Sequence, residues 1–192
     1  MNKLGWALVL NVAFVLAILA TLFAFSPRRA RGAEGNARWS RADLPVQLAV
    51  APEAADHMGA VARAAWILNR ACSCELFLGP RLVSIVWVKD FYRGGHGIRG
   101  VVLVRADGEF VPPHGHSEPV FSRPGRMFSV VVTLPRERIP DWQLRGMILH
   151  ELGHATGHLQ HSDDPESAFF EVVLPGQHLR GPEWRWLRGY RQ

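Results

Sequence analysis

The sequence predicts a single domain of mixed α/β (α+β) type, with a twisted mixed sheet, a covering helix, a motif-bearing helix and a C-terminal helix. Three observations predict it. The 192 residues, 48% of them hydrophobic, suffice for one core. Runs rich in β-branched residues are interspersed with segments of helical periodicity. No internal repeat is evident. The expected organisation is an apolar segment at 1–25, a linker at 26–42 and a folded domain at 43–192.

The N-terminal segment is the longest apolar run in the chain. Residues 5–25 contain no charged side chain, and as a helix they would extend roughly 30 Å, the thickness of a bilayer core. The apolar part of a signal peptide is usually only about 7–15 residues long. The length therefore favours a retained, single-pass membrane anchor. The small residues before Ala33 leave a cleaved signal open as the alternative.

The first half of the domain is expected to alternate strands with one helix. Leu44 to Val50 alternates as a half-buried strand does. Residues 81–88, 101–104 and 128–134 are rich in β-branched residues and predict three more strands. Residues 53–71 have a helical pattern, whose inner face is expected to hold Val61, Ala64, Ala65, Trp66 and Leu68.

Turn residues divide the second half. The Asp-Gly pair at 107–108 could open a hairpin. Residues 111–126 contain four prolines and are expected to form a loop. Proline and acidic residues favour a first helical turn, so the Pro-Asp pair at 140–141 predicts the start of one helix. Residues 181–183 predict the start of another, which carries Trp184 and Leu187.

The first of these two helices contains the most specific motif of the chain. His150, Glu151 and His154 form an H-E-x-x-H pattern. Side chains at i and i+4 share a helix face, so both imidazoles can reach one Zn²⁺ at about 2.0–2.1 Å. The glutamate then lies near the metal without occupying it, and can take a proton from a water that the metal activates. The pattern predicts a catalytic zinc site with Glu151 as the general base.

A third ligand must come from beyond the helix. His158 would lie too far along a continuous helix to share an ion with His150. Gly157 can end the helix, because glycine adopts the left-handed conformation that commonly closes one. His161 has four steps in which to return toward the metal, whereas His158 has almost none. We expect His161 to be the third ligand and His158 to lie at the rim or behind a ligand.

The stretch H-E-L-G-H-A-T-G at 150–157 resembles the zinc helix and turn of the metzincin metallopeptidases, especially the matrixin-like branch. In that family H-E-x-x-H-x-x-G-x-x-H binds the metal through three histidines. Residues 161–165 also resemble the matrixin continuation. The resemblance extends weakly over residues 39–192, and it implies a metzincin-like fold, one Zn²⁺ and hydrolysis of peptide or protein substrates.

The chain departs from the family pattern in two places. Gln160 occupies the strict position of the third ligand, so His161 arrives one residue late. Phe169 stands where the family's methionine turn would place its methionine. A phenylalanine can still supply an apolar floor below the metal. We expect Phe169, Phe170 and Val172 to line the substrate pocket.

Two other readings remain open. His178 lies in a stretch that looks like the third-ligand region of SprT-like proteases, and Glu171 could serve as the ligand of a gluzincin-type site. Alternatively, the chain is a non-catalytic, membrane-tethered zinc module. The presence of Glu151 argues against that last reading, because a structural site has no need of a base.

Charge and the remaining motifs limit the partners. The net charge is +5, but the arginines are scattered, so no nucleic-acid partner is expected.

Basic residues after the anchor favour a cytoplasmic domain, whereas the metzincin resemblance implies an extracytoplasmic one, which we expect. Cys72 and Cys74 are expected to be small residues at a helix end rather than a disulfide. His114 and His116 are expected to be solvated rather than a second metal site. The sequence does not indicate an oligomeric state.

Overall fold

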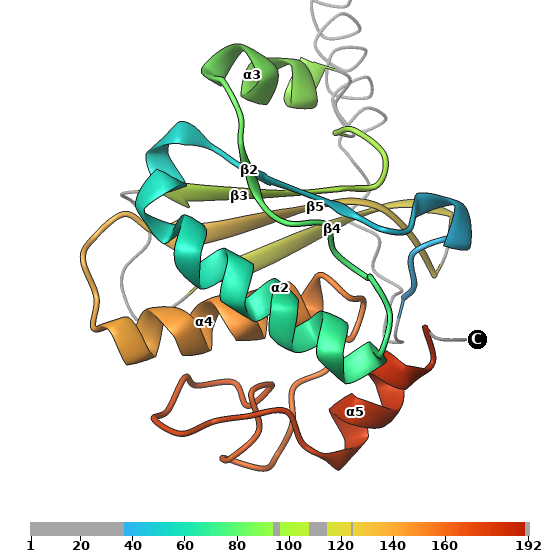
Figure 1. Ribbon diagram of the computed structural model, residues 1–192, viewed down its shortest axis with the longest axis vertical. Coiled ribbons are helices and arrows are strands. Elements are labelled where there is room, and N and C mark those ends of the chain that lie inside the picture. The colour runs from blue at the N-terminus through green and yellow to red at the C-terminus, as the bar shows by residue number, and fades with distance from the viewer. Residues whose placement is uncertain (1–36, 94–96, 108–114, 124, 191–192) are drawn as a thin grey trace, which may run out of the picture. The chain divides into compact units, whose positions relative to one another are not determined.

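The computed structural model describes residues 37–93, 97–107, 115–123 and 125–190 (Figure 1). The N-terminal segment, and with it the predicted anchor, lies outside the described residues. Within them, no helix is long and apolar enough to cross a membrane. The elements, in chain order, are η1 Arg41–Asp43, β1 Gln47–Val50, η2 Pro52–His57, α2 Met58–Cys72, β2 Arg81–Leu82, α3 Ile85–Arg93, β3 Val101–Asp107, β4 His116–Arg123, β5 Arg126–Pro135, α4 Asp141–His154 and α5 Gly181–Arg188.

The five strands form one mixed sheet in the order β2-β1-β3-β5-β4. β1 runs parallel to both β2 and β3, and β3 runs parallel to β5. Only β4 is antiparallel to its neighbour, and it forms one edge of the sheet. The prediction of a mixed α/β fold is confirmed. β3 and β5 lie where strands were predicted, and β1 begins at Gln47.

Helices cover both faces of this sheet. Strand side chains alternate between the faces, so Val102 and Val130 join the larger core beneath α2 and α4. Leu103 and Val131 point the other way and pack against Val88 and Phe91 of α3. Figure 1 shows α2 and α4 on one side of the sheet and α3 on the other. The two faces of the domain are therefore different surfaces, and only one of them bears the motif.

The predicted helix at 53–71 is present, although its first turn is the 3-10 helix η2 and α2 proper begins at Met58. Val61, Ala64, Ala65 and Leu68 are buried, as expected. Trp66 is 54% exposed and does not belong to the inner face. Trp66 was assigned to the wrong side of the helix, because it follows the buried Ala65 and successive residues of a helix point about 100° apart.

The strand predicted at 81–88 is wrong. Only Arg81 and Leu82 pair with β1, and the chain then forms α3. The side chain of Ser84 accepts a hydrogen bond from the backbone N–H of Trp87 at 3.2 Å, which caps the helix. Val88 and Phe91, spaced three apart, are then buried against the sheet. The cap and this spacing outweigh the β-branched composition.

The loop predicted at 111–126 is also wrong, because β4 occupies His116–Arg123. Proline fits there because β4 is an edge strand, where one side of the backbone has no strand neighbour. The register shifts between Val120 and Phe121, and such irregularities are common in edge strands. The expected hairpin after Asp107 does not form within the described residues, since β3 pairs with β5 rather than with β4.

The linker predicted at 26–42 is too long. Ala37 and Trp39 are buried in the main core, with 0% and 4% of their surface exposed. The backbone of Arg38 pairs with strand β5 through Met127. The folded domain therefore begins at or before residue 37.

The expectation of two unpaired cysteines is corrected as well, because Cys72 and Cys74 form a disulfide. Ser73 between them has a left-handed φ of 54°, which turns the chain at the end of α2. Their Cα atoms therefore lie 5.2 Å apart, within the usual range for a disulfide.

Candidate metal centre

The site begins with the burial of α4. Four apolar residues, Met147, Ile148, Leu149 and Leu152, are buried on this helix and hold it against the sheet and α2. His150 and His154 lie one turn apart on the same helix, with 5% and 9% of their surfaces exposed. Their Nε2 atoms are 2.9 Å apart. The helix thus delivers two imidazoles to one point, as the H-E-x-x-H spacing predicts.

The turn after α4 is fixed by distant parts of the chain. Gly157 has φ +93°, the left-handed conformation that was expected to close the helix. Its carbonyl accepts a hydrogen bond from the N–H of Ala37 at 2.9 Å. Trp39 donates from its indole to the carbonyl of Ala155 at 2.8 Å, and the Tyr190 hydroxyl donates to the carbonyl of Thr156. Both ends of the domain therefore hold this turn in place.

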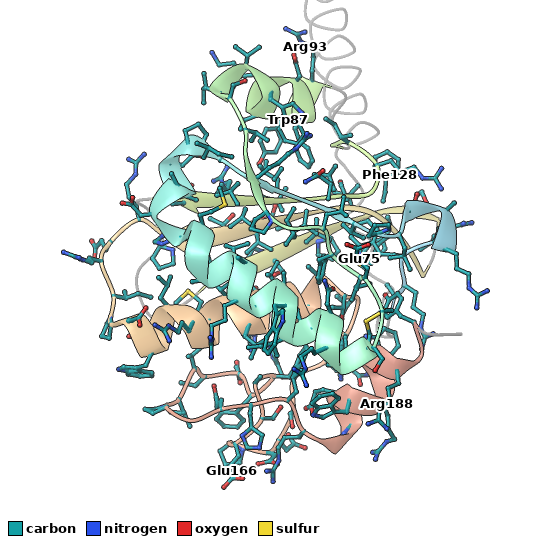
Figure 2. The ribbon with its side chains drawn as sticks, viewed as in Figure 1. Glu75, Trp87, Arg93, Phe128, Glu166 and Arg188 are labelled. Carbon is teal, nitrogen blue, oxygen red and sulfur yellow. A yellow bond between two sulfur atoms is a disulfide. The ribbon has the colours of Figure 1, made fainter. Side chains whose placement is uncertain are left out.

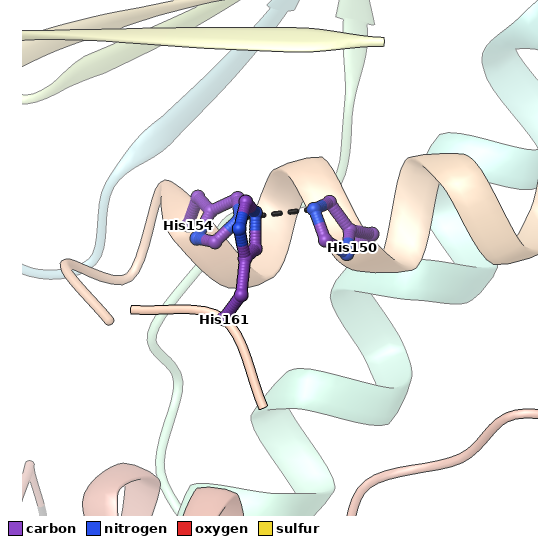
Figure 3. Close-up of side chains that lie close together, drawn as sticks. All are labelled: His150, His154 and His161. Atoms are coloured by element: carbon purple, nitrogen blue, oxygen red, sulfur yellow. Dashed lines mark hydrogen bonds between the residues drawn. The ribbon is translucent and has the colours of Figure 1, made fainter. Parts of the chain in front are cut away.

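The chain reverses after this turn and brings back His161 (Figure 3). One ligand nitrogen each from His150, His154 and His161 lies within 4.8 Å of the others, a group that could hold a metal ion. The His161 ring lies 5.3 Å from that of His150 and 5.0 Å from that of His154, centre to centre. His161 is exposed, so this third side of the group faces solvent.

The hydrogen bonds of the two buried histidines decide which nitrogen faces the group. Nδ1 of His150 lies 2.9 Å from the carbonyl of Ala168, and Nδ1 of His154 lies 2.6 Å from the carbonyl of His158. A carbonyl can only accept, so each Nδ1 carries the hydrogen and each Nε2 is left as an acceptor. Two acceptors 2.9 Å apart repel each other unless a cation lies between or beside them. This donor set fits a metal ion.

Burial also keeps these rings neutral. It lowers the pKa of His150 to about 4 and that of His154 to about 3. Metal binding requires neutral imidazole. A proton is therefore a poor candidate for the cation between the two Nε2 atoms, and a metal ion is a good one.

Phe169 packs against the histidine rings, at the position where an apolar floor was expected. It is fully buried, and its ring lies 5.5 Å from that of His154 and 4.7 Å from that of His158. A Cβ at Gly153 would come within 2.4 Å of this ring, so α4 can approach it closely only because residue 153 is glycine. His158 holds His154 through its backbone carbonyl, while its own ring stacks on Phe169.

Glu151 projects from α4 beside the histidine group and is 5% exposed. Ser117 of strand β4 donates to its carboxylate at 2.5 Å, and lies 3.0 Å from its backbone carbonyl. Burial raises the pKa of Glu151 to about 7, and the bond from Ser117 opposes that shift. Sequence reasoning missed Ser117, because it placed this stretch in a loop. A strand predicted at this position would have indicated that the side chain of Ser117 could face the site.

A cavity of about 450 Å³ opens over these residues. Glu151 and the three histidines line it together with Leu159, Glu171, Val173, three residues of β4, His116, Ser117 and Pro119, and Gly115 just before that strand. The expected pocket residues Phe169, Phe170 and Val172 are not among them. Phe169 is committed to the floor beneath Gly153, and Val172 is 42% exposed.

The alternative ligands lie elsewhere. His178 hydrogen-bonds through its ring to the carbonyl of Gly176 at 3.2 Å and does not belong to the histidine group. Glu171 lines the cavity, but its carboxylate is not within the group either. His116 lies 3.4 Å from Glu118 on the exposed surface of β4. His114 lies outside the described residues.

Neither a family model nor a curated protein sequence matches this chain in the comparisons made. The assignment of function therefore depends on the site itself.

Proposed function

We propose that this chain is a zinc-dependent endopeptidase of metzincin-like type, tethered to a membrane through residues 5–25. The observation that carries the proposal is the convergence of His150, His154 and His161 on one point, with the carboxylate of Glu151 in the same cavity. A structural zinc site usually has four protein ligands, whereas a catalytic site has three and an open position. The described residues supply three.

Zinc, when bound, polarises a carbonyl and lowers the pKa of a coordinated water. The chain's own residues would hold the metal and transfer the proton. His150 and His154 present Nε2 because carbonyls hold Nδ1, and Glu151 is placed to accept a proton from the attacking water. Burial raises the pKa of this carboxyl group in the metal-free chain, which makes it a stronger base than a glutamate in open water. Ser117 orients the carboxylate.

The edge strand favours a peptide as the substrate. β4 pairs with β5 on one side only, and its first residues line the cavity. An extended peptide can add to such an edge through backbone hydrogen bonds. That arrangement would lay a peptide bond across the cavity beside Glu151, and it requires no particular side-chain sequence.

The disulfide supports an extracytoplasmic location. Disulfides persist in oxidising compartments and are rare in the cytosol. Cys72 and Cys74 are the only cysteines of the chain, and they are paired. We therefore propose an exported catalytic domain, in spite of the arginines that follow the apolar segment.

Metal analysis of the purified full-length chain tests the proposal. We expect about one zinc per chain, loss of most of it in His161→Ala, and retention in His178→Ala, the matched control. A chelator should abolish cleavage of an unfolded protein such as casein, and zinc should restore it.

Two outcomes would overturn the proposal. Zinc lost in His178→Ala but retained in His161→Ala would assign the site to the SprT-like arrangement. Full zinc binding without any cleavage of denatured proteins would support the non-catalytic module instead.

A further inference from the structure

We propose that the face of the domain formed by α3 and the segment before it docks onto the surface of the membrane that anchors the chain. The inference rests on the proposed tether, and it adds an orientation: the anchored domain would lie against the bilayer with its cavity turned away. Exposed apolar residues, unpaired cations and the length of the connecting chain support it.

Exposed large apolar residues lie on the outer side of α3. Nine such side chains are exposed among the described residues, and three of them, Ile85, Val86 and Tyr92, belong to this helix. Ile85 and Val86, at the start of α3, have 53% and 63% of their surfaces accessible. Neighbouring exposed apolar side chains mark interaction surfaces, whereas singly scattered ones are normal.

The helix itself has two faces. Val88 and Phe91 are buried against the sheet, and Trp87 lies between the helix and the sheet in Figure 2, 5.8 Å from Phe91. Val86 is exposed, and Arg93 projects outward from the other end of the helix (Figure 2). Such a helix can bury its outer apolar side chains at the boundary between headgroups and acyl chains while it remains attached to the sheet.

The charged residues of this face suit anionic headgroups. Arg81, Lys89 and Arg93 are exposed beside the apolar side chains. Arg93 pairs with Asp90 at 2.9 Å. No acidic side chain within the described ranges forms an ion pair with Arg81 or Lys89. Two cations next to exposed isoleucine and valine favour a surface that contains anionic lipid, because charge attraction then adds to the burial of apolar area.

The tether keeps the domain close to the bilayer. The uncharged run ends at Phe25, and the folded domain has begun by Ala37. The connection of residues 26–36 can extend to at most about 40 Å when fully stretched. A membrane is therefore always within reach of this surface, and weak contacts suffice at such a high effective concentration.

Docking in this orientation has a consequence for the substrate. α4 lies on the face of the sheet opposite α3 (Figure 1), and the cavity opens beside α4. The cavity would then face the aqueous phase. The proposal therefore selects soluble proteins or long extramembrane loops as substrates, and excludes segments buried in the bilayer.

The test uses a fluorescent label on the full-length chain in nanodiscs of phosphatidylcholine and anionic phosphatidylglycerol. The chain has no free cysteine, so Val86→Cys provides a single reactive thiol. Arg185→Cys on α5 is the matched control, because it is exposed and lies on the other side of the sheet. We expect the label at position 86 to shift to shorter wavelength and to be quenched by lipids with a spin label near the headgroup. The label at 185 should do neither.

A second variant tests the charges. Arg81→Glu with Lys89→Glu should reduce quenching at position 86, and high salt should reduce it in the unaltered background, because both weaken attraction to anionic lipid. Equal, weak quenching at 86 and 185 in nanodisc-bound protein would overturn the docking. A chain that separates from the nanodiscs would instead contradict the tether. Nanodiscs added in excess to that released chain would still report contact at 86, and its absence would overturn the docking.

Discussion

At the scale of a single residue, two opposing effects set the pKa of Glu151. Burial disfavours its charged form, and the hydroxyl of Ser117 favours it by donating to the carboxylate at 2.5 Å. Their combination holds its pKa at about 7, where a carboxyl group both accepts and releases a proton. A glutamate in open water would have a pKa well below this and would be a weaker base.

Replacing Glu151 by glutamine should separate metal binding from catalysis. Glutamine keeps the shape of the side chain but cannot accept the proton, so we expect activity to fall by roughly 10²–10⁴-fold. Zinc content and thermal stability should remain close to those of the unaltered chain. The measurement is cleavage rate alongside metal analysis of the same preparation. Loss of zinc together with activity would make Glu151 a structural residue.

Ser117→Ala should lower kcat by roughly 10-fold or more, since a hydrogen bond to a charged group contributes about 1.5–3 kcal/mol. KM should change little, because the hydroxyl contacts Glu151 rather than the substrate. Ser117→Thr retains the hydroxyl and should restore most of the rate, whereas Ser117→Val should not. Equal rates in the threonine and valine variants would assign Ser117 a packing role only.

At the scale of elements, the sequence predicts helices and strands that have local sequence signals, and it does not predict those that depend on contacts with distant parts of the chain. The helix that carries His150 and His154 could be predicted, because the histidine spacing, the proline just before the helix and the glycine in the turn after it are all local signals. The third histidine could be predicted too, from the length of chain after Gly157. The nature of α3 could not be inferred from composition, because Ile85 and Val86 favour a strand and only the sheet makes Val88 and Phe91 a buried helical pair.

Strand β4 was missed for a similar reason. A proline such as Pro119 argues against a strand unless the strand lies at an edge, and the edge position is a property of the whole sheet. Ser117 was missed with it, since its role depends on the strand that carries it. The cysteine pair was missed because the left-handed conformation of Ser73 has no clear signal in the sequence.

Two glycines provide a matched test of the turn. Gly157 and Gly176 both have positive φ, at +93° and +82°. A Cβ at 157 would come within 1.9 Å of the carbonyl of Ala37, whereas a Cβ at 176 would meet nothing within 4 Å. We expect Gly176→Ala to lower the free energy of unfolding by about 1–2 kcal/mol, the cost of the left-handed conformation. Gly157→Ala should cost substantially more and should reduce zinc retention. Thermal melts and metal analysis of both variants provide the measurement, and equal losses would contradict the close approach.

At the scale of the whole molecule, the chain combines a long uncharged segment, a disulfide and a cavity lined by histidines. Each bears on the location of the domain, and the disulfide and the proposed metzincin-like function both favour an extracytoplasmic one. The basic residues after the apolar segment favour the opposite orientation. The pairing of Cys72 and Cys74 therefore offers the most direct check.

The chain isolated from its native membranes under non-reducing conditions should not react with a thiol-specific maleimide until it is reduced. A variant without residues 1–25, retained in a reducing cytosol, should react at both cysteines without added reductant. Free thiols in the native chain would contradict the extracytoplasmic proposal. The number of labelled cysteines by mass spectrometry provides the measurement.

The hydrogen bond between Ala37 and Gly157 has a mechanical consequence. Ala37 is the first described residue after the proposed tether, and its N–H is bonded to the turn that separates His154 from His161. A pull on the proposed tether would load Ala37 and, through its N–H, the turn between two of the three histidines, while Arg38 would pass the same load to strand β5. Tension along the tether would therefore act on the geometry of the histidine group.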